Sequence, residues 1–235
     1  MTEKPDVTKL VLDLMKKPTD RDQQVVVGAS NFSTPCARCV AEALVAMGGS
    51  VPNQWWMGAW NGTAIHNRLD DLTTKYRPTW EPEQKIVLGS LKGYGTIKST
   101  TDLYVPEYRL CADYKSTTRD KLKYIKDALT TPPGEFDSTK RAEARFKVTG
   151  YKNQVFSYAR GLVALGKPVE WVSLVFICRD GLTDKDVWDY TEPYDPVKAE
   201  AVWNRLERLW AWIKAGHTPD EMIHMEHCYY RGREE

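Results

Sequence analysis

Residues 101–117 read TDLYVPEYRLCADYKST, and they hold the clearest pattern in the chain. Two runs rich in aliphatic and aromatic residues flank a short Pro-Glu-Tyr segment, which is typical of two strands joined by a turn. We therefore expect a hairpin with strands over residues 95–104 and 109–115, connected through residues 105–108. The connection sets which side chains share a face.

The polar residues of this hairpin are predicted to converge. If the turn is centred on the middle of the connection, Asp102 faces Cys111 and Asp113 is its diagonal neighbour on the same face. Diagonal neighbours lie roughly 7 to 8 Å apart at Cα, so both carboxylates can reach one shared cation. Because side chains alternate along a strand, Lys115 joins Asp113 on that face and Tyr114 points away.

Two carboxylates and one ammonium group suit phosphodiester hydrolysis. Carboxylate oxygens hold Mg²⁺ or Mn²⁺, and a neighbouring lysine can orient the attacking water or stabilise developing negative charge. The alternative is a solvated hairpin face carrying a cross-strand ion pair, and the Asp-x-Lys pattern alone does not distinguish the two.

Helical and strand patterns surround the hairpin. Five helices are predicted. The first covers residues 35–47 with Thr34 as its N-cap, and the second starts near residue 61 and continues past Leu72. The others cover residues 118–129, 139–165 and 195–215. Predicted strands cover residues 85–88 and 169–178. These elements indicate an α/β fold in which a short mixed sheet carries the hairpin between flanking helices.

The first residues differ in pattern from the rest. Residues 7–17 predict a short amphipathic helix, and a polar segment follows it. We therefore expect an N-terminal helical appendage over residues 1–25 and one domain over residues 26–235.

Composition leaves the choice of substrate open. The 235 residues include 33 basic and 32 acidic side chains, for a net charge of +1, so binding to nucleic acid would depend on a local basic surface. No apolar segment follows a basic start and no apolar run has the length of a membrane span. Five cysteines, an odd number, favour a reducing compartment over a disulfide framework. We expect a cytoplasmic protein of a bacterial or phage-infected cell.

A series of motifs is more specific than the hairpin alone. In order, it comprises Gly62-Thr-Ala-Ile-His66, Gly93-Tyr-Gly95, Thr101-Asp-Leu103, Ala112-Asp-Tyr-Lys-Ser-Thr117 and Gln154-x-x-x-Tyr158. This series, spanning roughly residues 34–179, resembles the RecB-like branch of the PD-(D/E)xK nuclease superfamily, including the CRISPR-associated and phage-encoded stand-alone exonucleases.

The resemblance implies a restriction-endonuclease-like core and a role for each matched position. The implied metal ligands are His66, Asp102, Asp113 and the backbone carbonyl of Tyr114. Lys115 would be the catalytic lysine, and Gln154 and Tyr158, four apart on one helix face, would complete the site. The implied activity is exonucleolytic hydrolysis of DNA with Mg²⁺ or Mn²⁺, on single-stranded DNA or free ends, in recombination, repair or phage DNA metabolism.

Rival interpretations remain at this stage. The same core serves structure- or sequence-specific endonucleases. A non-catalytic DNA-binding module is the other rival, in which basic residues and aromatic side chains do the binding. Arg119, Lys121, Lys123 and Lys126 are candidate phosphate contacts, although an exposed helix face explains each of them singly. Glu83 is a possible further carboxylate that we leave outside the predicted site.

The cysteines predict a second site. Cys36-x-x-Cys39 and His224-x-x-x-Cys228 have ligand spacing suited to structural Zn²⁺, with His217 and His227 as alternative donors. Family members with an iron-sulfur cluster place one cysteine before the core and three after it, and this chain departs from that arrangement. The alternative is a helix start with two buried thiols and an unrelated His-rich tail. We expect Cys111 and Cys178 to be core residues.

Overall fold

The computed structural model describes residues 27–46, 56–132 and 138–228. The helix predicted over residues 7–17 and the boundary at residue 25 lie outside this range, so the division into appendage and domain stays a prediction. Among the described helices, none combines the length and apolar character needed to cross a membrane.

A five-stranded sheet forms the centre of the fold. Its order is β1 (Glu81–Pro82), β4 (Leu103–Val105), β5 (Leu110–Thr117), β6 (Trp171–Cys178) and β7 (Val187–Pro193). The β5–β6 pair is parallel and the other pairs are antiparallel, so the sheet is mixed, as predicted. A parallel pair needs a long crossover connection, which α5 (Arg119–Thr130) and α6 (Thr139–Ala164) provide.

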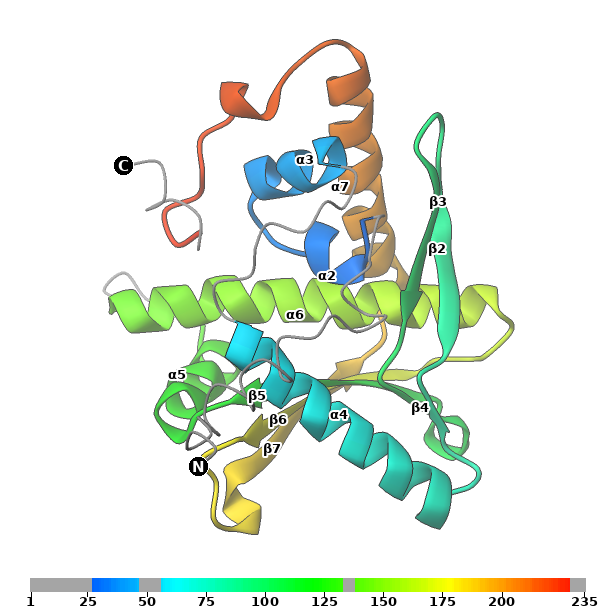
Figure 1. Ribbon diagram of the computed structural model, residues 1–235, viewed down its shortest axis with the longest axis vertical. Coiled ribbons are helices and arrows are strands. Elements are labelled where there is room, and N and C mark those ends of the chain that lie inside the picture. Colours follow the sequence, from blue (N-terminus) through cyan, green and yellow to red (C-terminus); the bar gives the residue numbers. More distant parts are fainter. Residues whose placement is uncertain (1–26, 47–55, 133–137, 229–235) are drawn as a thin grey trace, which may run out of the picture.

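Helices cover both faces of the sheet (Figure 1). The long helix α6 packs on β5 and β6, and α2 (Ala29–Phe32), α3 (Ala37–Val45) and α7 (Pro196–Lys214) lie on its far side. The other face packs against α4 (Trp56–Tyr76). The predicted architecture, a short mixed sheet between helices, is therefore confirmed.

The alternation predicted for β5 is also confirmed. Ala112 and Tyr114 belong to a small apolar cluster with Leu103 and Val105, against which Leu69 of α4 packs. The intervening Cys111 belongs to the main core instead. The residues between these apolar positions, including Asp113, therefore face α6.

A second hairpin stands apart from the sheet. It comprises β2 (Lys85–Leu91) and β3 (Gly95–Thr100), with a register shift between Val87 and Gly89. Gly89 has a φ of 148°, and a Cβ there would lie 2.4 Å from the ring of Trp203 on α7. The bulge and the missing side chain thus let the hairpin seat closely on α7.

The hairpin register differs from the prediction. Tyr104, not Asp102, pairs with Cys111, because residues 106–109 all belong to the turn. Pro106–Tyr108 form a 3-10 turn that the N–H of Arg109 closes by donating to Pro106 O at 3.1 Å, with Arg109 in the left-handed region. The turn has the predicted four residues but lies one residue later in the chain, so each residue pairs with a partner two positions further along.

Other element boundaries also differ. The strand predicted over residues 95–104 divides into β3 and β4, which belong to different sheets. The first predicted helix begins at Ala37 after an N-cap at Cys36, so Thr34 is not the cap. The second already runs at residue 56, where the described part of the chain resumes, ahead of the predicted start. The strands β1 and β7 were not predicted.

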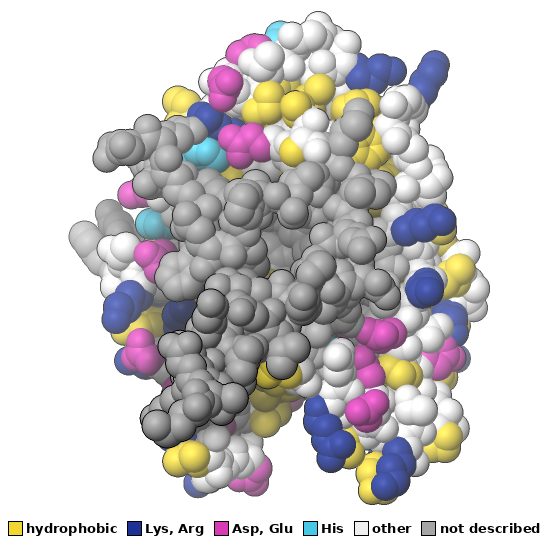
Figure 2. Space-filling view, viewed as in Figure 1, with side chains coloured by type: hydrophobic (Ala, Val, Ile, Leu, Met, Phe, Trp, Pro, Cys, Tyr) yellow, Lys and Arg dark blue, Asp and Glu magenta, His cyan; other side chains and the backbone are white. Residues whose placement is uncertain are grey.

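Around the residues drawn in grey, charged side chains of both signs are interspersed in Figure 2. This mixture agrees with the near-zero net charge of the chain. A local site, rather than an overall field, must therefore account for any selective binding of an anion.

Candidate active site

Strand β5 places Asp113 and Lys115 on the face toward α6. The Nζ atom of Lys115 lies 2.6 Å from Oδ2 of Asp113, which is fully buried. Successive strand residues point to opposite faces, so two residues apart is the spacing that brings these charges together. The sequence prediction that they share a face is borne out by this contact.

Asp102 reaches the same place from the segment before β4. Its Oδ2 accepts a 2.7 Å hydrogen bond from the backbone N–H of Tyr114. Its backbone carbonyl accepts from the N–H of Glu83 at 3.3 Å. The predicted convergence of Asp102 and Asp113 is therefore observed, although the register that produces it is not the predicted one.

His66 approaches Asp102 from α4. Its Nδ1 atom lies 3.4 Å from Oδ1 of Asp102, and its ring packs edge-on to Tyr114 with centroids 5.7 Å apart. Burial opposes protonation of the imidazole, but the hydrogen bond and charge of Asp102 outweigh it and raise the pKa of His66. The Asp102 carboxylate therefore contacts both His66 of α4 and the backbone of β5.

Helix α6 supplies the groups that hold Lys115. The Nζ of Lys115 donates to Oε1 of Gln154 at 3.0 Å, and Nε2 of Gln154 donates to the Tyr158 hydroxyl at 2.7 Å. Both α6 residues are buried. Gln154 therefore contacts the lysine directly, and Tyr158 contacts Gln154.

Tyr151 is a further neighbour that the sequence prediction missed. The Lys115 ammonium lies 5.0 Å from its ring centroid, a distance typical of a cation–π contact. Tyr151 lies one turn before Gln154, so the helical spacing of residues 151, 154 and 158 was the signal available in the sequence.

The charges in the site are mutually dependent. Burial, together with the negative charge of Asp102, raises the pKa of Asp113 to about 7 against the opposing effect of Lys115. Burial works against the ammonium of Lys115, but Asp113 and Asp102 raise its pKa. The site thus holds a lysine cation beside two closely spaced carboxyl groups.

The carboxylates fit a divalent cation. Within the described part of the chain, neither side-chain oxygen of Asp113 accepts a hydrogen bond of normal geometry, although both are buried and Oδ2 lies near Lys115. Buried carboxylate oxygens without hydrogen bonds are costly unless another positive group binds them. Hard oxygen donors of this kind match Mg²⁺ and Mn²⁺.

Three basic residues of α5 have intramolecular partners. Arg119 pairs with Asp186, Lys123 with Asp120, and the Lys126 ammonium lies over the ring of Trp188. Lys121 is exposed, as is Glu83, which has a φ of 49°. None of these residues joins the contacts described above for Lys115, so their roles in binding phosphate or metal stay predictions.

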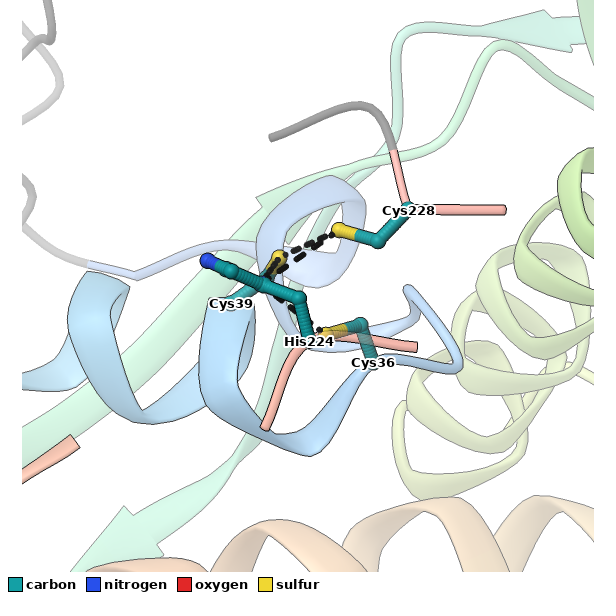
Figure 3. Close-up of side chains that lie close together, drawn as sticks. All are labelled: Cys36, Cys39, His224 and Cys228. Atoms are coloured by element: carbon teal, nitrogen blue, oxygen red, sulfur yellow. Dashed lines mark hydrogen bonds between the residues drawn. The ribbon is translucent and has the colours of Figure 1, made fainter. Parts of the chain in front are cut away.

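The predicted cysteine and histidine cluster assembles at a separate place (Figure 3). One donor atom from each of Cys36, Cys39, His224 and Cys228 lies within 4.8 Å of the others. The alternative donor His217 instead stacks on Trp212 and contacts Glu221, and the predicted alternative His227 is not in the cluster. Cys111 and Cys178 are buried free thiols of the core, as predicted.

Known structures provide an independent comparison. Neither a protein-family model nor a curated protein matches this sequence. A phage related exonuclease from Haemophilus somnus 129PT aligns with a TM-score of 0.51 at 11% identity, over 82% of this chain and 96% of that one. An alkaline exonuclease from Laribacter hongkongensis aligns with a TM-score of 0.52 at 11% identity, over 84% and 94%. The chain therefore has the restriction-endonuclease-like fold of these exonucleases.

Proposed function

We propose that this protein is a divalent-metal-dependent exonuclease that hydrolyses phosphodiester bonds from DNA ends. The observation that carries the proposal is the convergence of half-buried Asp102 and Lys115 on the buried carboxylate of Asp113, in a fold shared with exonucleases. Fold alone does not determine activity, and the site supplies the chemistry. The two carboxylates and the lysine provide for cation binding and for stabilisation of negative charge.

The metal ligands in this proposal come from three elements. Asp102 and Asp113 provide carboxylate oxygens, and His66 provides an imidazole nitrogen. Within one strand residue, the N–H and the C=O point toward the same edge of the strand. Because the N–H of Tyr114 donates to Asp102, the Tyr114 carbonyl also points toward the edge where Asp102 lies. A bound Mg²⁺ or Mn²⁺ would polarise a phosphoryl oxygen and lower the pKa of an attacking water.

Lys115 would act on the attacking water and on the charge of the phosphate. Its ammonium donates to Gln154 and lies beside Asp113, so its position is determined from both the strand and α6. Tyr158 anchors Gln154 in turn, and Tyr151 covers the ammonium. A cation held in a fixed position stabilises developing charge without reorganising during the reaction.

The fold and the site together support DNA as the substrate class in this proposal. Both aligned structures are described as exonucleases, one of them phage related. We therefore favour DNA with free ends, in single-stranded or processed form, and a setting of recombination, repair or phage DNA metabolism in a bacterial or phage-infected cell. Cleavage within the strand is the alternative that the experiment must distinguish.

The test is digestion of end-labelled linear and closed circular single-stranded DNA with Mg²⁺ or Mn²⁺. The wild type, Lys115→Ala and an exposed-lysine control, Lys185→Ala, are compared with and without EDTA. Progressive loss of linear DNA alone, abolished by Lys115→Ala and by EDTA but not by Lys185→Ala, supports the proposal. Cutting of the circle indicates an endonuclease. Binding without cleavage of either substrate overturns the catalytic assignment and favours a DNA-binding module.

A further inference from the structure

A second group of metal-binding side chains lies on the far side of α6 from the sheet. Cys36 and Cys39 belong to the start of α3, and His224 and Cys228 follow η4 (Pro219–Glu221) near the end of the chain. Cys36, His224 and Cys228 are buried, with exposed fractions of 0%, 6% and 7%. Cys39 is half-buried. Three thiols and an imidazole gathered in a largely buried group are typical of a structural metal site.

The separations match those of four ligands around one ion. The Nδ1 atom of His224 lies 3.5 Å from Sγ of Cys36, 3.5 Å from Sγ of Cys39 and 3.7 Å from Sγ of Cys228. Tetrahedral zinc, with Zn–S of about 2.3 Å and Zn–N of about 2.0 Å, places sulfur and nitrogen about 3.5 Å apart. The three measured distances therefore describe the nitrogen corner of such a tetrahedron.

One sulfur pair is closer than zinc would hold it. Sγ of Cys39 lies 3.0 Å from Sγ of Cys228. Two sulfurs bound to one zinc lie about 3.8 Å apart, so these two would separate by about 0.8 Å, which side-chain rotation can supply. An iron-sulfur cluster places several iron and sulfide atoms between its thiolates and needs a wider cage. The compact group suits a single ion.

The histidine is oriented as a metal ligand. Its Nδ1 faces the three thiols, while its Nε2 lies 3.6 Å from Oε1 of Glu42 on α3. A carboxylate behind the second ring nitrogen is the usual arrangement for metal-bound histidine, because it sets the tautomer and the ring orientation. Glu42 is itself held by Arg38 at 2.9 Å.

We propose that Cys36, Cys39, His224 and Cys228 bind one structural zinc ion. The ion joins the start of α3 to the segment after η4, which lie 188 residues apart in sequence at Cys36 and His224. Arg38 reinforces the same junction by donating to Met222 O at 3.2 Å and to Asp220 Oδ1 at 3.1 Å. The site lies apart from Asp102 and Asp113 and serves the fold whether or not the protein cuts DNA.

The experiment measures metal content directly. Full-length protein is expressed with both zinc and iron supplied, purified without oxygen, and analysed for both metals and for acid-labile sulfide. We expect one zinc per chain, no iron and no sulfide. Substituting cobalt for zinc is expected to produce the intense visible bands of a tetrahedral thiolate site.

Variants provide the control and guard against misfolding. Cys228→Ser is expected to lose zinc and to melt several degrees lower, whereas the core variant Cys178→Ser keeps one zinc per chain. If Cys228→Ser does not fold, the cobalt spectrum of the wild type still tests the site. Iron with sulfide, fewer than one zinc in two chains, or equal zinc in Cys228→Ser overturns the proposal. None of these measurements depends on nuclease activity.

Discussion

The carboxylate of Asp102 accepts the backbone N–H of Tyr114 at 2.7 Å, just beyond the last backbone pair between β4 and β5. In a longer β4, a backbone carbonyl would accept this hydrogen bond from Tyr114. The side chain of Asp102 accepts it instead. The same contact brings Asp102 next to Asp113. Ending the short strand early therefore positions the carboxylate and also satisfies the neighbouring strand.

The two functions of Asp102 can be separated by substitution. Asp102→Asn keeps an acceptor for Tyr114 N–H but loses the negative charge, so activity is expected to fall more than about 100-fold with Tm nearly unchanged. Asp102→Ala loses the acceptor as well, which costs about 1 kcal/mol of stability. Nuclease assays and thermal melts of both variants measure the difference. Equal activity of Asp102→Asn and wild type would contradict the ligand assignment.

Cation binding is expected to stabilise the fold through Asp113. Burial and the negative charge of Asp102 raise the pKa of Asp113 to about 7. A bound cation relieves the repulsion between these two carboxylates. Mn²⁺ at one hundred times its Kd would stabilise the wild type by about 2.7 kcal/mol, seen as a higher Tm. The same titration of Asp113→Asn should show little shift. A shift of wild-type size in the variant would place the cation elsewhere.

Gln154 is expected to act by positioning Lys115. Gln154→Leu removes the acceptor at 3.0 Å from the ammonium, so kcat should fall by about 10- to 100-fold with little change in KM. Tyr158→Phe removes only the support of Gln154 and should have a smaller effect of the same kind. Steady-state kinetics on linear DNA provide the measurement. A rise in KM at constant kcat would indicate a role in substrate binding instead.

Gly89 is expected to be essential to the seating of the β2–β3 hairpin. An alanine Cβ would lie 2.4 Å from the Trp203 ring at a φ of 148°, so Gly89→Ala should destabilise the protein by about 2 kcal/mol or more. Gly62→Ala is the matched control, because that helical position has open space and gains helix propensity of up to about 1 kcal/mol. Denaturant unfolding measures both. Equal free energies of unfolding for the two variants would contradict the expected clash between residue 89 and Trp203.

Local periodicity accounts for what could be predicted from the chain alone. Strand alternation placed Asp113 and Lys115 on one face, and helical spacing placed Gln154 and Tyr158 together. The spacing of Cys36 with Cys39, and of His224 with Cys228, likewise marked two halves of one site. The strand and helix relations depend only on backbone geometry within one element, and the cysteine and histidine spacings only on neighbouring residues of the chain, both of which the order of residues specifies.

Relations between elements could not be predicted in the same way. The register that brings Asp102 beside Asp113 depends on a turn that closes at Arg109, and moving a turn of the same length by one residue changes every partner. Tyr151 joins the site because α6 packs across β5 and β6. Strand β7 pairs at the sheet edge, where its positions alternate between exposed and half-buried and none is fully buried. Residue order thus determined the chemical groups and their faces. Turn geometry and packing, which act between distant segments, determined which of those groups meet.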